Sequence, residues 1–181
     1  MNVILSAVSL ILFSGLLFSA DNRAENILLH QRNNGGWPKN YDQNHKLTEV
    51  EKQKLRSDKK KNDTTFDNGA THTEVRYLAK AFKSTGDKRF EKAFLEGIEF
   101  MLDAQYNNGG WPQCHPHPKG YSARITFNDG AMIGVISTLR DISRNRKAFP
   151  FVNDDLRKRC SKAVSKGIAC ILKCQIMVKG K

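Results

Sequence analysis

Two short acidic segments carry the side chains best suited to chemistry. Asp67-Asn68 and Asn128-Asp129 each stand just before a predicted helix. One side chain of each pair is expected to cap its helix by accepting hydrogen bonds from the first free amides. The carboxylate and amide oxygens that remain are hard ligands of the kind that calcium prefers. Taken alone, this spacing leaves two interpretations open, helix capping and a calcium site.

A repeated turn sequence holds both tryptophans. Asn-Asn-Gly-Gly-Trp-Pro is a strong turn, because Asn and Gly tolerate a positive φ and Pro stops a helix from resuming. Trp37 and Trp111 are expected either to plug the ends of the helices or to offer flat ring faces to sugars. His72 follows the first acidic turn, where it can reach a bound anion or cap neighbouring groups.

These turns belong to an internal repeat. Seven of the eight residues in 31–38 recur in 105–112, displaced by 74 positions. The apolar stripe of residues 90–105 likewise returns at 160–175. A fixed displacement of this kind is the signature of an architecture built from repeated units.

The acidic turn is repeated as well, with residues 66–70 returning at 127–131. Each copy opens another helix with one apolar face, and Thr71 and Glu74 have the spacing of a capping box. The unit is therefore a helix, a Gly-Gly-Trp-Pro loop, an acidic turn and a second helix. Since each helix hides only one stripe, neighbouring units must pack against each other.

This pattern predicts an all-α fold of helical hairpin repeats that forms part of an α/α toroid. Long helices are predicted over residues 71–84, 87–105, 129–144 and 154–174. Asp67 and Asp129 should lie close together, because equivalent loops of successive units share one rim. The third unit has only begun at Gln175 when the chain ends at Lys181, so we expect the toroid to be truncated there.

The first 20 residues differ from the rest of the chain. Val3 to Phe18 is uncharged and apolar but short for a bilayer span, and Ser19-Ala20 supplies small residues for cleavage. Residues 1–20 are therefore predicted to be a signal peptide and 21–181 a single domain. The protein is expected to be secreted or periplasmic, with no stable membrane association after cleavage.

The formal net charge of +12 favours a polyanionic partner: nucleic acid, an anionic membrane surface or an acidic polysaccharide. Much of that charge lies in residues 52–61, which are predicted to form a solvated loop. Nucleic acid is the least favoured partner, because the basic residues do not alternate with aromatics on any helix face. Nucleotide-binding, serine-hydrolase and HExxH zinc motifs do not occur in the sequence.

Five segments resemble the calcium-dependent pectate lyases built on an α/α toroid, and they occur in the same order as in that family. The segments are QRNNGGWPKN at 31–40, DNGATHTEVR at 67–76, AQYNNGGWP at 104–112, ITFNDGAM at 125–132 and ILKCQIMVKG at 171–180. The resemblance covers about residues 21–181. It identifies the chain as the N-terminal portion of such a domain.

The resemblance implies β-elimination of polygalacturonate, in which Ca²⁺ bridges the enzyme and a substrate carboxylate while an arginine removes the C5 proton. It implies that Asp67 and Asp129 are catalytic and metal-binding residues, and that Asn68 and Asn128 are their substrate-binding neighbours. The arginine of the family comes later in its domain. We therefore expect the base beyond Lys181 and negligible cleavage by the chain itself.

Two other functions stay open. A non-catalytic module could bind pectate through the same cleft. Another toroid enzyme, such as a glycoside hydrolase, would need an acid and a base about 5 to 10 Å apart. Asp67 and Asp129 can supply such a pair, although the order of the motifs argues against it.

Overall fold

The computed structural model describes residues 21–176 and 178, and its regular structure in that part is helical. The α-helices are α1 (Asn22–His30), α2 (Glu49–Asp58), α3 (His72–Thr85), α4 (Lys88–Asp103), α5 (Ala131–Arg144) and α6 (Asp154–Lys173). Three single 3₁₀ turns join them: η1 (Asp67–Gly69), η2 (Gly120–Ala123) and η3 (Asn128–Gly130). The all-α prediction is confirmed, whereas the predicted signal peptide lies outside the described residues.

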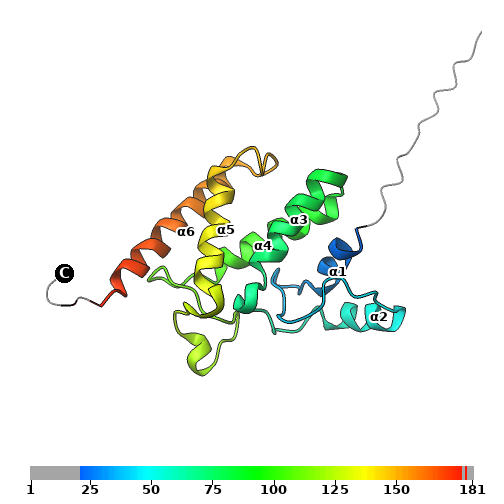
Figure 1. Cartoon of the computed structure of the whole chain (residues 1–181), viewed down its shortest axis with the longest axis horizontal. Helices are drawn as coiled ribbons and strands as arrows, with labels where there is room; N and C mark the ends of the chain where they lie inside the picture. Colours follow the sequence, from blue (N-terminus) through cyan, green and yellow to red (C-terminus); the bar gives the residue numbers. More distant parts are fainter. Residues whose placement is uncertain (1–20, 177, 179–181) are drawn as a thin grey trace, which may run out of the picture.

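The four long helices form two hairpins, with α3 packed against α4 and α5 packed against α6 (Figure 1). All four begin and end within two residues of the predicted bounds. Asp87 begins α4 by accepting a hydrogen bond from the Arg89 amide, at 2.8 Å, and Asn153 begins α6 in the same way. Gly86 ends α3 with a φ of 72°, a conformation that glycine adopts without strain.

Successive units lie side by side in an arc. Helix α1 contacts α3 and α4, α3 contacts α5, and α4 contacts α6. Figure 1 accordingly shows α1, the pair α3 and α4, and the pair α5 and α6 in this order across the molecule, with α2 at the same end as α1. Helices α1, α4 and α6 occupy the same position in their repeats, so they form one row and α3 and α5 form the other. This arrangement is part of a helical toroid, as predicted.

The core fills the space between the two rows. Its largest fully buried side chains come from both rows and from the connecting loops: Trp37, Trp111, Phe66, Phe94, Ile27, Leu78, Ile98, Met101, Met132, Leu139, Ile142 and Val75. The apolar stripes of the helices supply most of this set. No helix in the part of the chain that the structure describes is long and apolar enough to cross a membrane.

The Lys-rich segment differs from its prediction. Residues 49–58 form α2 rather than a loop, because Thr48 and Glu51 make a reciprocal capping box at its start. An ion pair of 2.7 Å between Lys52 and Glu49 lies on its surface. No residue of α2 is buried, so its apolar pattern was too weak to reveal a helix.

Candidate active site at the rim between two repeats

The Gly-Gly loops fix the spacing between units. Gly35 and Gly109 have φ values of 90° and 93°. A Cβ at Gly35 would stand 2.4 Å from the Glu96 carbonyl oxygen on α4, and one at Gly109 would stand 2.2 Å from that of Lys166 on α6. Only glycine satisfies both the backbone conformation and the close approach. Each loop is therefore docked on the next unit's helix.

A glutamine fastens each loop. The Gln31 amide donates to the Gly35 and Ala93 carbonyl oxygens, at 3.0 and 2.9 Å. In the next unit Gln105 donates to the Gly109 and Ala163 carbonyl oxygens, at 3.0 and 2.8 Å. Each glutamine therefore joins its own loop to the following unit's helix, which holds the rim of the arc in register.

The tryptophan side chains of both loops lie in the core of the protein. Both side chains are fully buried, and each indole N–H donates to a helix carbonyl at 2.7 Å, from Trp37 to Ile27 and from Trp111 to Met101. The prediction that they are substrate-binding residues with open ring faces is wrong, because neither ring reaches solvent. They plug the ends of the helices, which was the alternative interpretation.

The acidic turns have the same backbone in both units. Asn68 in η1 and Asp129 in η3 have φ values of 52° and 48°, a region that Asn and Asp enter more readily than most residues. Neither turn supplies a side-chain cap to the helix that follows. The capping interpretation is therefore wrong for both turns, and their side chains are available for other contacts.

Two threonines hold η1 in place. Thr65 Oγ1 accepts a hydrogen bond from the Asp67 amide at 3.0 Å and donates to the Gln113 carbonyl oxygen at 2.7 Å. Thr71 Oγ1 donates to the Thr65 carbonyl oxygen at 2.9 Å and accepts from the Trp37 amide at 3.1 Å. Thr71 is thus occupied elsewhere and forms no capping box, contrary to the prediction for Thr71 and Glu74. The turn is tied to both Trp-Pro loops.

Asp67 is a buried carboxylate with one oxygen unused. Its side chain is 4% exposed. Lys39 Nζ donates to Oδ2, whereas Oδ1 is buried without a hydrogen-bond partner. Burial alone would raise the pKa of Asp67, but the hydrogen bond and charge of Lys39 outweigh it and hold the pKa below its usual value. A buried, charged oxygen without a partner is costly, which marks this atom as a ligand position.

Asp129 stands beside Asp67 but faces solvent. The turns η1 and η3 are in contact, which confirms the prediction that the two acids share one rim. Asp129 is exposed, and the Asn128 amide donates to its Oδ2. Asn128 therefore orients the carboxylate, while the neighbouring pair Asp67 and Asp129 brings two negative oxygen donors together.

Lys39 and Asn40 are site residues that the sequence interpretation missed. Lys39 pairs with Asp67, and Asn40 Oδ1 accepts a hydrogen bond of 3.0 Å from Asn68 Nδ2. Two consecutive loop residues thus contact two consecutive residues of η1. The sequence feature that could have identified them is their position, because both polar residues directly follow Trp37-Pro38 in the repeated loop.

The donor set fits a hard cation. Asp67, Asp129 and Asn68 supply carboxylate and amide oxygens, which suit Ca²⁺. The described residues contain no group of three or more His, Cys, Asp or Glu side chains arranged for a metal. A cation held here would therefore need ligands in addition to the Asp67 and Asp129 carboxylates.

His72 does not reach an anion. Its Nε2 atom is buried without a partner, and the ring covers Gly134 of α5, where an added Cβ would stand 2.2 Å from Nε2. Burial, with a smaller contribution from Arg76, lowers the pKa of His72 to about 4. The neutral ring therefore packs α3 against α5.

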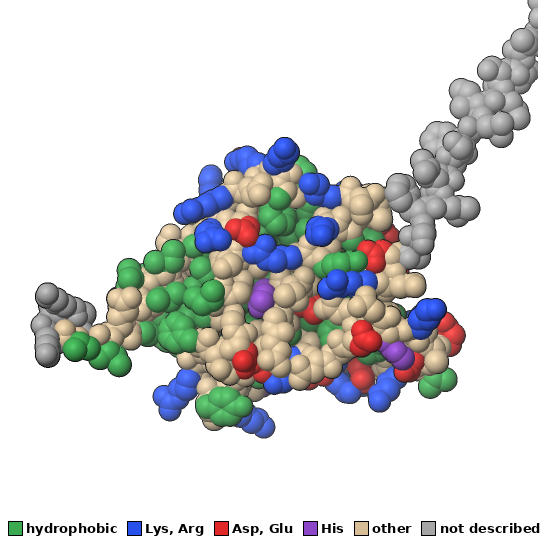
Figure 2. All heavy atoms as spheres, in the orientation of Figure 1, with side chains coloured by type: hydrophobic (Ala, Val, Ile, Leu, Met, Phe, Trp, Pro, Cys, Tyr) green, Lys and Arg blue, Asp and Glu red, His purple; other side chains and the backbone are tan. Residues whose placement is uncertain are grey.

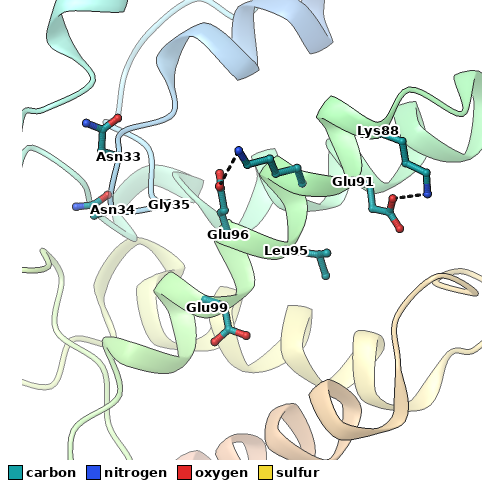
Figure 3. A pocket seen from close by; sticks show the side chains of 9 residues that line it. Asn33, Asn34, Gly35, Lys88, Glu91, Leu95, Glu96 and Glu99 are labelled. Carbon is teal, nitrogen blue, oxygen red and sulfur yellow. Dashed lines mark hydrogen bonds and ion pairs between the residues drawn. The ribbon is translucent and has the colours of Figure 1, made fainter.

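A separate hollow lies on the outer side of α4. Figure 3 shows this cavity of about 420 Å³, lined by the first Gly-Gly loop and by helix residues that include Glu91, Glu96 and Glu99. Lys88 pairs with Glu91 at 2.6 Å, and Lys92 lies 3.8 Å from Glu96. Glu99 pairs with Arg159 at 2.5 Å, so each of the three carboxylates has a basic partner and the hollow has no excess positive charge for an acidic ligand.

Family comparison is consistent with the repeat and with the two acidic turns. The family described as pectic acid lyase matches residues 31–181, which include both Gly-Gly-Trp-Pro loops and both acidic turns. The chain belongs to this family. Among curated proteins no match was found.

Solved structures of the family share the fold. The family 10 polysaccharide lyase from Cellvibrio cellulosa is 34% identical, with a TM-score of 0.76 over 90% of this chain and 48% of its own. A mutant of that lyase in complex with trigalacturonic acid gives the same identity and TM-score, over 90% of this chain and 49% of its own. The chain thus spans about half the length of these pectic acid lyase relatives.

Surface charge agrees with an acidic ligand without locating it. On the face in Figure 2, Lys and Arg side chains are most numerous over the upper half, and others lie at the lower and right edges. Hydrophobic side chains gather on the same face toward the end where α5 and α6 lie. The positive net charge favours attraction of a polyanion in general.

Proposed function

We propose that this pectic acid lyase family member acts on polygalacturonate by calcium-dependent β-elimination, and that the rim formed by η1 and η3 holds the cation. The observation that carries the proposal is the buried, partnerless Oδ1 of Asp67 beside the exposed carboxylate of Asp129. A pair of carboxylates without a cation is unfavourable at close range. Both a calcium ion and the acidic polymer it bridges would relieve that repulsion.

Each rim residue has a distinct part in this proposal. Asp67 and Asp129 bind the cation, and Asn128 holds the Asp129 carboxylate in orientation. Lys39 donates a hydrogen bond to Oδ2 of Asp67 and so balances the charge on that oxygen. Bound Ca²⁺ would polarise the uronate carboxylate and so acidify the adjacent C5 proton. The buried Thr65 and Thr71 keep η1 fixed, so little reorganisation accompanies binding.

We predict that the proton-abstracting arginine lies in the region that corresponds to the half of the solved relatives that the chain does not match. Arg76 is a poor candidate, because its guanidinium donates to Thr138 Oγ1 at 2.8 Å and to Asp141 at 2.7 Å. Both partners lie on α5, so Arg76 joins α3 to α5.

The test uses calorimetric titration of the protein with CaCl₂, followed by electrophoresis through polygalacturonate gels with calcium or with EDTA. We expect calcium binding and calcium-dependent retardation, both reduced in Asp129→Ala. Asp155→Ala, an exposed acid at the start of α6, serves as the control for charge. Retardation that EDTA leaves unchanged would contradict the calcium site.

Elimination is followed separately through release of unsaturated uronate. We expect negligible release from this chain, because the base is predicted to lie elsewhere. Robust calcium-dependent release that Asp129→Ala abolishes would establish lyase activity and show that the base is within the chain. The protein could instead bind polygalacturonate and release no unsaturated uronate, even after addition of the half of the domain that this chain does not match. That result would favour the alternative of a non-catalytic pectate-binding module.

We also propose secretion, on the basis of the uncharged apolar run in residues 3–18. The protein expressed in a secreting host should be recovered outside the cytoplasm with Asp21 as its first residue. N-terminal sequencing of the recovered protein tests this, and an intact Met1 on exported protein would contradict it.

A further inference from the structure

A cavity between α1 and α2 lies apart from the acidic rim and has no part in the function proposed above. Helix α2 lies beside α1 at one end of the molecule (Figure 1), but no residue of α2 is buried. The space between the helices holds about 670 Å³ and is lined by α1, α2, residues 45–47, Lys59 and Arg89. This size is within the range of small-molecule sites, about 300–1,000 Å³.

Helix α2 presents cations rather than apolar side chains to this cavity. Lys52, Arg56 and Lys59 line it, and residues three and four positions apart lie on one face of a helix. Among the described residues of the lining, Glu25 is the one acid. The face that a helix turns toward the body of a protein is normally apolar. The cationic face of α2 therefore points to an anion between the two helices.

Lys59 carries a charge that the fold leaves uncompensated. Its side chain is half-buried, and Nζ donates to the Leu28 and Gln31 carbonyl oxygens, at 3.0 and 3.2 Å. These partners are neutral. Burial is the main cause that lowers the pKa of Lys59, so its charged form is costly where it stands. An ammonium group has three N–H donors, which leaves one of them for a ligand.

Arg56 is the second cation with capacity for a ligand. Its guanidinium donates to the neutral side chain of Gln53 at 3.4 Å, whereas Arg89, also in the lining, is paired with Glu25 at 2.5 Å. Arg56 and Lys59 are three residues apart on α2, so their side chains are neighbours. Two adjacent cations of this kind suit one carboxylate, which can accept hydrogen bonds from both.

The rest of the cavity supplies aliphatic surface. Leu28 and Leu29 of α1 and Leu47 of the connecting segment line it, and all three side chains are half-buried. The described lining contains no Phe, Tyr or Trp and so offers no aromatic face to a sugar ring. Aliphatic side chains gain stability when a hydrocarbon group covers them. The ligand chemistry is therefore an anion with an aliphatic part.

We infer that this cavity binds a free aliphatic carboxylate, with Arg56 and Lys59 on the carboxylate and Leu29 and Leu47 on the hydrocarbon chain. The site uses neither the acidic turns nor calcium, so it is independent of the function proposed above. It assigns a binding role to α2, a helix that contributes nothing to the core.

The test titrates the protein with octanoate, decanoate and decanol in buffer with EDTA, and follows the backbone amides by two-dimensional NMR. Arg56→Met removes an exposed cation of the proposed site. Lys54→Met is the matched control, because Lys54 is also exposed on α2 but lines a different cavity. Leu47→Gln removes part of the aliphatic surface. Circular dichroism checks that each variant is folded.

We expect decanoate to shift the amide signals of residues 45–59 and of α1. Its affinity should exceed that of octanoate by at most about fourfold for each added CH₂ group. Arg56→Met should weaken decanoate binding about tenfold, and Lys54→Met should leave it nearly unchanged. Leu47→Gln should reduce the difference between the two acids. Decanol should bind more weakly than decanoate.

Four results would overturn the site. The first is the absence of decanoate binding, and the second is an equal loss in Arg56→Met and Lys54→Met. The third is equal affinity for decanoate and decanol, or for decanoate and octanoate, because the site requires both the charge and the chain. The fourth is a set of shifts confined to the exposed apolar residues at the other end of the molecule, such as Ile133 and Leu172.

Discussion

Asp67 and Asp129 meet at the junction of two repeats, one buried and paired with Lys39 and the other exposed and paired with Asn128. They do not occupy equivalent positions, since Asp67 aligns with Asn128 and Asp129 aligns with Asn68. The repeat therefore places an acid first in one turn and second in the next. This offset leaves one carboxylate buried and the other exposed to solvent.

The two acids should differ in what their loss changes. Asp67→Asn and Asp129→Asn are each expected to weaken calcium binding at least tenfold, because each removes a charged oxygen donor. Asp67→Asn should also lower the free energy of unfolding by about 1–3 kcal/mol, because it removes the charged hydrogen bond between the buried carboxylate and Lys39. Asp129→Asn, at an exposed position, should change it by less than about 0.5 kcal/mol. Calorimetry and urea denaturation measure these two effects.

The glutamine that joins the first two units should carry substantial stability. Gln31→Leu leaves the buried carbonyl oxygens of Gly35 and Ala93 without their donor, which should lower the free energy of unfolding by about 1–3 kcal/mol. Gln53→Leu, on the exposed surface of α2, is the control and should have little effect. Equal urea midpoints for the two variants would show that the loop is held by packing alone.

The second Gly-Gly loop should tolerate no side chain. Gly109→Ala combines a φ of 93° with a Cβ that meets the Lys166 carbonyl oxygen at 2.2 Å. Strain and overlap together should cost about 3 kcal/mol or more. Gly86→Ala shares the positive φ, 72°, but meets nothing within 4 Å, so it should cost only about 1–2 kcal/mol. Thermal denaturation distinguishes the two, and a similar loss in both would assign the whole effect to backbone strain.

Acid should destabilise the protein through His72. Its pKa in the folded protein is about 4, against 6.5 for an unperturbed histidine, so the unfolded chain binds the extra proton first. The contribution of His72 to the free energy of unfolding is therefore complete above pH 6.5. It is lost as the pH falls toward 4, and the loss is at most about 3 kcal/mol. The group that packs against the ring on α5 is Gly134.

The measurement compares urea midpoints from pH 7 to pH 4 for the wild-type protein and for His72→Phe. The variant should show a shallower loss over that range, because it cannot take up the proton. His45→Phe replaces an exposed histidine and should follow the wild-type slope. Parallel slopes for all three proteins would mean that other groups, such as His30, whose pKa burial also lowers, dominate acid unfolding.

Local pattern and repetition let the sequence determine most of the helical framework. The apolar stripes fixed α3 to α6 to within two residues of their observed ends, because amphipathic spacing is imposed by burial of one face. The displacement of 61 positions between the two acidic turns also predicted that Asp67 and Asp129 lie on one rim. The sequence pattern did not predict helix α2, because this helix buries no side chain and so has no apolar stripe.

Only the tertiary structure decided what each candidate side chain does. Trp37 and Trp111 have the composition of sugar platforms, yet packing between units buries both rings. Asp67 and Asp129 look alike in sequence, but one is enclosed by Lys39 and Gln113 while the other faces solvent. Burial and hydrogen-bond partners depend on contacts between residues distant in the chain, such as Lys39 with Asp67, and neither periodicity nor spacing encodes those contacts.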